Sequence, residues 1–365
     1  MSTATALLIT TDDLLLDDVL RLAAAAGHRV EVAHDPPAAV RAWPTATAVL
    51  VGADQAAAMA QLRPPAREQV HLVGRGALPD EQFRHALALG ARDVLELPAA
   101  DTWLVELLTD LGDGSPREGA LVAVLAGSGG AGATTFACAL ALVAAGEQDT
   151  VLVDLDPLGP GVDRVVGLDP AVGDPELPLA DGLAVRWDAL VSASGRLGSR
   201  ALRDALPRHG RLAVLGWGPR PPVALDPVAV REVLSAARRG HDLVVADLPR
   251  SVDPVTEEVL ARAGQVVVLV EPTVPGVASA GRLVGRVQRL TSALGVVVRQ
   301  GRGVAAAQVG EALGLPVLAE LGHHRRLAED VDLGLGPVRS RRSPLARAAR
   351  EVLDGIGQPP ERWVA

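Results

Sequence analysis

The sequence of 365 residues has no lysine, no asparagine and no tyrosine, and it has a single cysteine, Cys138. One cysteine excludes a framework of intramolecular disulfides and fits a reducing cytosol. The missing residue types are those with AT-rich codons, so a GC-rich genome explains their general shortage. Drift of that kind normally exchanges lysine for arginine and keeps the positive charge. At two positions of a glycine-rich loop described below, however, an uncharged residue stands where a lysine is expected.

Long hydrophobic runs are missing too. The apolar run at the N-terminus stops at Asp12 and Asp13, too early for a signal peptide or a membrane span. A formal net charge of −9 argues against a protein that coats nucleic acid. We therefore expect a cytoplasmic protein with no specific nucleic-acid partner.

The chain instead contains two series of short apolar strands that alternate with amphipathic helices. Such alternation predicts parallel sheets covered by helices on both faces. The first series has predicted strands at 5–9, 29–33, 48–52, 70–74 and 93–97. The second has predicted strands at 121–127, 150–156, 211–218, 242–249, 265–272, 295–300 and 316–322.

A stretch rich in glycine, proline, serine and charge, at 111–119, separates the two series. We place a first domain at 1–112, a linker at 113–119 and a second domain at 120–365. The weakly patterned stretch 170–210 is interpreted as an insertion with one or two short helices. The predicted fold class is α/β, with two domains that are each built on a parallel sheet.

The stretch LAGSGGAGATTFA, at 125–137, has the glycine spacing of a phosphate-binding loop between a strand and a helix. It matches G-x-x-x-x-G-K-[ST] everywhere except at Ala133, which stands where the motif has lysine. Glycines let backbone N–H groups surround a phosphate, and a helix N-terminus adds positive potential. The residues expected to contact a nucleotide are Gly127, Ser128, Gly129, Gly130, Ala131, Gly132, Ala133, Thr134 and Thr135.

Acidic residues at the ends of two later strands favour a nucleotide site over a glycine-rich turn without a ligand. Asp247 ends an apolar strand, where a carboxylate can hold Mg²⁺, and a hydroxyl at Thr134 or Thr135 can ligate the same ion. Asp154 and Asp156 follow the strand after the loop helix. The loop alone is a weak signal, whereas the three features in this order form a stronger one.

The order of the loop, VLVDLDPLGPGVD, HDLVVADLPR and VVVLVEPT resembles the MinD/ParA superfamily of deviant Walker A ATPases, which have a P-loop NTPase fold. With a receiver-like domain in front, the chain is similar to the CpaE/TadZ branch. It most resembles the septum site-determining (Ssd) proteins of actinobacteria, over essentially its full length. The resemblance implies a homodimer that binds ATP with Mg²⁺ and works with cell-division or pilus-assembly proteins.

The resemblance also implies roles for single residues. Thr134 and Asp247 would bind Mg²⁺, and Asp156 would position the attacking water. The family's first loop lysine corresponds to Ser128, and its adenine-reading asparagine corresponds to Arg299.

Loss of both lysines weakens binding of a triphosphate, because each charge-assisted hydrogen bond contributes about 1.5–3 kcal/mol. A lost donor to developing charge typically costs roughly 10²–10³ in rate. We therefore expect weak ATP binding and little or no hydrolysis. The alternative is a working ATPase in which an arginine such as Arg164 or Arg299 replaces the lysines.

The first domain resembles a response-regulator receiver, with a flavodoxin-like sheet. Asp12 and Asp13 stand where a receiver has its acidic pair, although a solvated helix N-terminus explains them equally well. Gly52 stands at the phosphoacceptor position, with Asp54 two residues later, and Leu97 replaces the receiver lysine. These changes predict a pseudoreceiver for docking or dimerisation. A phosphorylated response regulator, with Asp54 as acceptor, is the weaker alternative.

The basic stretch 337–357 predicts an amphipathic helix with Leu345, Ala349 and Val352 on one face. Such a helix can contact a membrane peripherally. Because the apolar face is short and rich in alanine, we favour a helix docked on its own domain. Together these features predict a regulatory or localisation protein that acts at the septum, or alternatively in pilus assembly.

Overall fold

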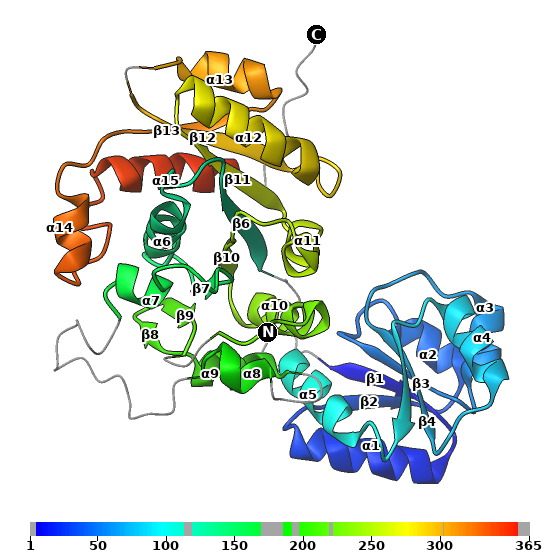
Figure 1. Cartoon of the computed structure of the whole chain (residues 1–365). Helices are drawn as coiled ribbons and strands as arrows, with labels where there is room; N and C mark the ends of the chain where they lie inside the picture. Colours follow the sequence, from blue (N-terminus) through cyan, green and yellow to red (C-terminus); the bar gives the residue numbers. More distant parts are fainter. Residues whose placement is uncertain are drawn as a thin grey trace. The chain divides into compact units, whose positions relative to one another are not determined.

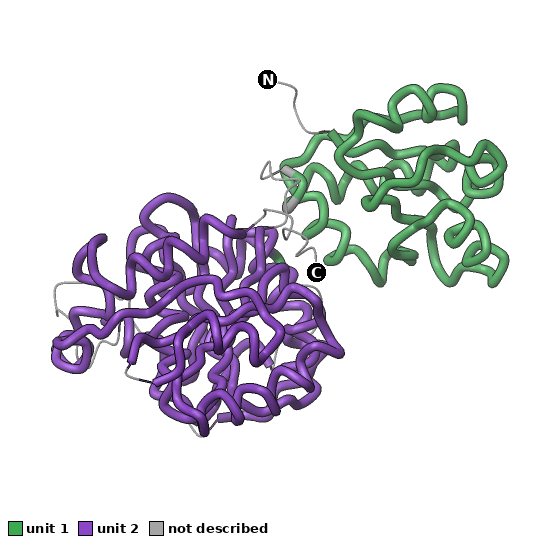
Figure 2. The backbone as a smooth tube through the Cα atoms, turned by 90° about the horizontal axis from the view of Figure 1, so that it is seen from above, with its two compact units in different colours: residues 1–117, 195–198 green, residues 118–194, 199–365 purple. Residues whose placement is uncertain are grey.

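The computed structural model describes residues 5–112, 119–168, 185–191, 197–218, 222–301 and 303–356. The chain divides into two compact units, which we call unit 1 (1–117 with 195–198) and unit 2 (118–194 with 199–365) (Figure 2). The linker expected at 113–119 lies outside the described residues, except for Gly119. The Gly119 N–H donates to the carbonyl of Arg238 in unit 2, at 2.7 Å.

Unit 1 contains a five-stranded parallel sheet in the order β2-β1-β3-β4-β5 (Figure 1). This order is that of flavodoxin-like folds, with β1 between β2 and β3. The strands are β1 (Ala6–Ile9), β2 (Val30–Ala33), β3 (Val49–Gly52), β4 (Val70–Arg75) and β5 (Asp93–Leu97). The helices are α1 (Asp13–Ala25), α2 (Pro36–Ala42), α3 (Ala56–Leu62), α4 (Asp80–Leu89) and α5 (Asp101–Gly112).

Both faces of this sheet are buried, as its continuous apolar strands predict. Leu8 on β1 belongs to a core with residues of α1 and α5. Its neighbours Leu7 and Ile9 point to the opposite face, into a core with residues of α2, α3 and α4. The alternation of side chains along one strand thus places consecutive residues in two separate cores.

Unit 2 contains an eight-stranded sheet in the order β13-β12-β11-β6-β10-β7-β9-β8. All pairs are parallel except β8 with β9, a short antiparallel pair that the sequence pattern did not predict. The strands are β6 (Ala120–Ala126), β7 (Thr150–Asp154), β8 (Arg208–His209), β9 (Leu212–Leu215), β10 (Leu243–Asp247), β11 (Gln265–Val270), β12 (Leu294–Arg299) and β13 (Val317–Leu321). The α/β fold class predicted for both domains is confirmed.

The described part of the insertion predicted at 170–210 contains two short helices, and its residues 170–184 and 192–196 lie outside the described residues. Among the described residues between β6 and β10, the helices are α6 (Ala133–Ala144), α7 (Val162–Val165), α8 (Trp187–Val191), α9 (Ser199–Ala205) and α10 (Pro227–Gly240). The rest are α11 (Pro254–Leu260), α12 (Val274–Val287), α13 (Ala306–Leu313), α14 (Leu327–Asp332) and α15 (Pro344–Gly355).

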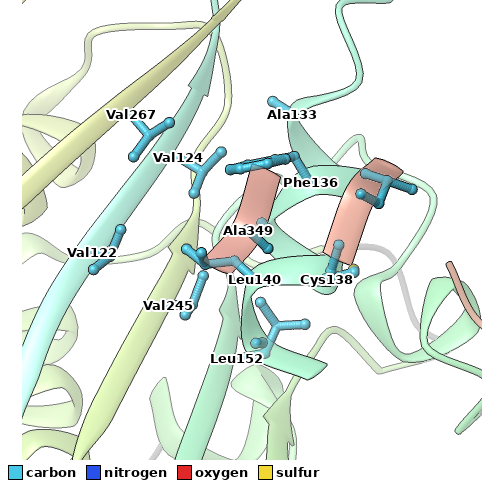
Figure 3. Close-up of a cluster of buried hydrophobic side chains, with 14 of the residues drawn as sticks. Val122, Val124, Ala133, Phe136, Cys138, Leu140, Leu152, Val245, Val267 and Ala349 are labelled. Carbon is cyan, nitrogen blue, oxygen red and sulfur yellow. The ribbon is translucent and has the colours of Figure 1, made fainter. Parts of the chain in front are cut away.

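Helix α6 is apolar on most sides because it lies between the sheet and α15 (Figure 1). Figure 3 shows Phe136 and Leu140 of α6 beside Val124 of β6 and Val245 of β10, in one buried cluster. Burial of an aliphatic or aromatic side chain of this size contributes about 1.5–3 kcal/mol. The packing holds the first turn of α6, and with it the glycine-rich loop, against the central strands.

Helix α15 packs on its own unit, as we favoured from the sequence. Leu345, Ala349 and Val352 are buried, and α15 contacts α6 and β13. The apolar face that a membrane would need is therefore covered in this structure. Over the described part of the chain, no helix combines the length and the apolar character required to cross a bilayer.

Candidate nucleotide site

The glycine-rich loop and the predicted acidic residues meet at the carboxyl ends of three adjacent strands, β6, β10 and β7. Asp154 and Asp247 are paired in register on β7 and β10, and Asp247 pairs with Val124 on β6. The loop follows β6 directly and leads into α6. Ligands of open α/β sheets bind at this edge, so the topology brings together residues more than a hundred positions apart.

The loop has the backbone shape that a phosphate cradle needs. A Cβ on Gly127 would lie 2.9 Å from the Leu269 carbonyl oxygen, so only glycine fits between the strands there. Gly130 and Gly132 have φ of 76° and 91°, a region that favours glycine. Gly132 caps α6, and the first intrahelical hydrogen bond runs from the Phe136 N–H to the Gly132 carbonyl. The N–H groups before Phe136 therefore have no partner within the helix.

Asp247 is the most unusual charged group of the site. Its side chain is 1% exposed, and neither carboxylate oxygen has a hydrogen-bond partner among the described residues. Burial, together with the nearby charge of Asp154, raises the pKa of Asp247 to about 8. The Thr134 hydroxyl, which faces the carboxylate without reaching hydrogen-bonding geometry, works in the opposite direction. A buried carboxylate without a donor is costly unless a ligand satisfies it.

Asp154 is buried as deeply but is hydrogen-bonded. Its carboxylate accepts the N–H of Asp156 at 3.1 Å and the N–H of Val162 at 3.2 Å. Burial nevertheless raises its pKa to about 7, and the two N–H groups only partly offset this effect. Its backbone carbonyl accepts the indole N–H of Trp187 at 2.6 Å. Asp154 thus shapes the turn after β7 and holds Trp187 beside the site.

Asp156, the predicted water-positioning residue, lies at the start of this turn and is half-buried. Its carboxylate accepts the N–H of Leu158 at 3.0 Å, and the Leu158 side chain is 91% exposed. The carboxylate therefore lies on the solvent side of Asp154. Its predicted role in activating water stays a prediction.

The residues predicted to hold Mg²⁺ fit a cation of that type. The Asp247 carboxylate has unsatisfied oxygens, and the Thr134 hydroxyl faces it from the first turn of α6. Mg²⁺ prefers oxygen ligands and is usually held by one or two carboxylates together with substrate phosphates. Within the described ranges no cluster of three or more His, Cys, Asp or Glu side chains forms a metal cage.

The loop side chains differ from what the motif requires. Ala133 is 6% exposed at the start of α6, and Ser128 has a buried hydroxyl that lacks a hydrogen-bond partner in the described chain. Both positions lack the cation that a phosphate-binding lysine supplies. That the loop residues bind a nucleotide stays a prediction.

Arg299 reaches the loop from the end of β12. Its Nη1 donates to the carbonyl of Gly130 at 3.3 Å and to the Glu271 carboxylate at 3.1 Å. Glu271 follows β11 directly and was not predicted as part of the site. A charged residue at the end of an apolar strand, next to the strand that carries Arg299, is the signal that could have found it. Arg164, the other arginine considered, lies on α7.

The corresponding edge of the sheet in unit 1 is closed by its own side chains. Asp54 accepts from the Thr10 hydroxyl at 2.8 Å, from the Thr11 N–H at 2.7 Å, from the Thr11 hydroxyl at 2.9 Å and from Gln55 at 3.1 Å. Burial works to raise its pKa, but these donors prevail and lower it. Asp12 caps α1 by accepting from the N–H groups of Leu14 and Leu15.

A comparison of families identifies the N-terminal part of the chain. Residues 9–119 match the model described as "Rv3660c-like, CheY-like N-terminal domain". The Mycobacterium tuberculosis protein Rv3660c is 37% identical over 350 residues, which cover 94% of this chain and 95% of that protein. The chain belongs to the Rv3660c-like family. Its receiver-like fold in unit 1 is confirmed by the same match, because CheY is a receiver.

Unit 2 of this Rv3660c-like chain shares its fold with MinD and ParA proteins. A ParA family ATPase from Chlorobium tepidum superposes with a TM-score of 0.55 at 15% identity, covering 65% of this chain and 98% of that one. MinD in the MinC:MinD complex of Aquifex aeolicus gives 0.53 at 17% identity, with 67% and 100% covered. The Pyrococcus horikoshii septum site-determining protein MinD, complexed with Mg-ADP, gives 0.52 at 18%, with 66% and 96% covered.

Proposed function

We propose that this Rv3660c-like protein is a regulatory or localisation protein of the MinD/ParA type that acts in septum-site determination and hydrolyses ATP little or not at all. One observation carries the proposal. The loop at 127–135 keeps the backbone geometry of a phosphate cradle, while Ser128 and Ala133 stand at both lysine positions. The MinD/ParA fold of unit 2 and its likeness to MinD proteins support the choice of cell division.

The charges of the site explain why, in this proposal, the protein still binds ATP but hydrolyses it little or not at all. Glycine N–H groups and the N-terminus of α6 hold phosphate through the backbone, which does not depend on side chains. Hydrolysis needs cations that stabilise charge as it develops, and each missing donor costs roughly 10²–10³ in rate. Mg²⁺, held by Thr134 and Asp247, would neutralise phosphate charge, with Asp156 beside it.

The proposed protein acts as a homodimer and recruits cell-division proteins. Its compartment is the cytoplasm, with peripheral contact at the inner face of the membrane or septum through a partner, because its own α15 buries its apolar face. Unit 1 is a pseudoreceiver that docks or dimerises rather than accepting phosphate, since the donors of Thr10, Thr11 and Gln55 already occupy Asp54. ATP with Mg²⁺ is the cofactor, bound weakly.

A second candidate is a localisation factor of pilus assembly, of the CpaE/TadZ type. The observation that favours it is the arrangement of a receiver-like unit before a MinD-like unit in one chain. The third candidate is a working ATPase in which an arginine supplies the missing charge. Arg299 lies at the loop, where it donates to the Gly130 carbonyl, but its charge is paired with Glu271, which disfavours this candidate.

Turnover and imaging separate these candidates. Purified full-length protein with ATP and Mg²⁺ should release phosphate no faster than its Asp156→Ala and Asp247→Ala variants. Release above both variants would make the protein an ATPase and overturn the catalytic part of the proposal. A fluorescent fusion in the source bacterium should collect at division septa. Collection at pilus bases, with normal septa after deletion, would favour the second candidate.

A further inference from the structure

The glycine-rich loop of unit 2 lacks both lysines but keeps the backbone geometry of a phosphate-binding loop. This difference affects which phosphates of a nucleotide it can recognise. Backbone N–H groups of such loops surround the α- and β-phosphates, whereas the loop lysine reaches the β- and γ-phosphates. We propose that this site binds a nucleoside diphosphate and a nucleoside triphosphate equally well, because it recognises the diphosphate and ignores the third phosphate. This inference rests on the proposed nucleotide site. A protein that does not distinguish the diphosphate from the triphosphate cannot be switched by nucleotide hydrolysis or exchange.

The diphosphate part of the site is preserved. Gly127 packs against the Leu269 carbonyl, and Gly130 and Gly132 have positive φ, so the loop keeps its curvature without a ligand. The first N–H groups of α6, at Ala133 and Thr134, precede the first intrahelical hydrogen bond and are available to a ligand. The helix N-terminus also favours an anion there.

Two unsatisfied polar side chains indicate that the site is built for a ligand. The Asp247 carboxylate is 1% exposed and has no donor on either oxygen among the described residues, and it faces Thr134 in the first turn of α6. The Ser128 hydroxyl on the loop is buried and likewise lacks a partner in the part of the chain that is described. Buried polar atoms of this kind are rare without a ligand, an ion or water to satisfy them.

No lysine remains to read a third phosphate, and the structure shows why Arg299 does not replace it. The Arg299 Nη1 donates to the Glu271 carboxylate and to the Gly130 carbonyl, and it approaches the loop from β12, beyond β11. Its charge is therefore matched by Glu271. The acids Asp154, Asp156 and Asp247 lie on the other side of the loop, toward β10 and β7. Apart from the proposed Mg²⁺, which a diphosphate meets as well, a third phosphate would find no lysine in the chain, and the nearby Arg299 is already paired with Glu271.

The test measures affinities of the full-length protein for ADP and for the non-hydrolysable analogue AMPPNP, with Mg²⁺, by isothermal titration calorimetry. The two dissociation constants should agree within about threefold. Ala133→Lys restores the loop cation and should tighten AMPPNP binding by roughly ten- to a hundredfold, with a smaller gain for ADP. Ser128→Ala is the matched control, because it changes the loop without adding charge, and it should leave the ratio near one.

Other results would overturn the inference. AMPPNP binding at least tenfold tighter than ADP binding in the wild type would show that another group reads the third phosphate. Arg299→Gln and Arg164→Gln then identify the group, since the preference disappears with the responsible arginine. Failure of both nucleotides to bind at millimolar concentration would also refute it. The localisation function would survive either result, because imaging of the fusion tests it independently.

Discussion

In each unit a carboxylate lies at the carboxyl edge of a parallel sheet, but the two carboxylates differ in their hydrogen-bond donors. In unit 1, Asp54 is surrounded by donors from Thr10, Thr11 and Gln55. In unit 2, Asp247 ends a central strand with no donor to either oxygen among the residues described. Both carboxylates stand in sites that lack their lysine, at Leu97 and at Ala133 respectively.

On the proposed function, we interpret the difference as that between a site with a structural role and a site that binds a ligand. Hydrogen bonds stabilise the charged form of Asp54 and lower its pKa, so the protein itself satisfies this carboxylate. Burial disfavours the charged form of Asp247 and raises its pKa to about 8, so this carboxylate reduces stability at neutral pH. Loss of a lysine alone therefore does not show whether a site has been abandoned. The hydrogen-bond donors around the remaining carboxylate are the more informative feature.

The largest effect should come from placing the same side chain in both sites. Gly52→Asp restores a receiver's acceptor residue, but its Cβ would lie 2.3 Å from Asp54 Oδ1 and 2.9 Å from the Ile9 carbonyl oxygen. We expect unit 1 to lose about 3 kcal/mol or more of unfolding free energy. Gly129→Asp, where a Cβ meets nothing within 4 Å, should change unit 2 little. Peptide-resolved hydrogen exchange in urea measures both.

A second variant controls for the mere addition of charge in unit 1. Asp54→Gly, combined with Gly52→Asp, removes the atom that clashes and should recover part of the lost stability. No recovery would mean that the close contact with Asp54 is not what excludes a side chain at this position. Equal losses for Gly52→Asp and Gly129→Asp would remove the contrast between the units.

An intermediate effect is expected from Asp247→Asn. The pKa of Asp247 is higher in the folded than in the unfolded protein. At a pH between the two pKa values, folding therefore takes up a proton, so the unfolding free energy falls as pH rises from about 4 to 8. The variant removes this loss. Its unfolding free energy should exceed that of the wild type by about 2 kcal/mol near pH 8, and the gain should shrink toward pH 5.

Urea unfolding across this pH range measures the effect of Asp247→Asn. Asp156→Asn is the matched control, since it removes a neighbouring carboxylate that is only half-buried. Because the charge of Asp156 contributes to the raised pKa of Asp247, its gain should be present but smaller than that of Asp247→Asn. A gain for Asp247→Asn that is independent of pH would mean that the carboxylate is charged in the folded protein.

The smallest effect should come from Asp54→Asn. The change removes charge from an acceptor of several hydrogen bonds and should cost about 1 kcal/mol near neutral pH. Because the folded pKa of Asp54 is lowered, its stabilisation is present above the unfolded pKa and is lost as pH falls through the folded value. The loss of stability relative to wild type should therefore diminish in acid, as the gain of Asp247→Asn also does, but the two variants change stability in opposite directions, as urea unfolding can show.

Acetyl phosphate tests the same residue chemically. It should leave the mass of the wild-type protein unchanged, because donors occupy both oxygens of Asp54. A phosphorylated Asp54 in a peptide map would restore the response-regulator alternative.

Much of the fold follows from the strand pattern, and the exceptions have physical reasons. Continuous apolar runs identified the buried parallel strands, because a strand covered on both faces tolerates few polar residues. The two-residue strand β8 was missed because its two residues are exposed and carry no such signal. The position of α15 was predicted from the weakness of its apolar face, and it packs against α6 and β13.

The candidate site was predicted less completely. The loop and Asp247 were recognised because glycine spacing and a carboxylate at a strand end are local features. Glu271 was missed, and so was the position of Arg299 on the loop carbonyl, because both depend on β11 lying between β12 and β6 in the sheet. The hydrogen bonds that Asp54 accepts from Thr10 and Thr11 were missed for the same reason, since β1 and β3 are neighbours only in the sheet.

The sequence by itself determined the α/β class, the order of the strands along the chain, the loop with its glycines and the absence of any lysine. These properties depend on residue type and short spacing, which a linear chain already contains. Tertiary structure alone decided that Asp54 is satisfied by its own unit while Asp247 is left without a donor. The state of a carboxylate depends on its burial and on which atoms surround it, and the folding of distant segments decides both.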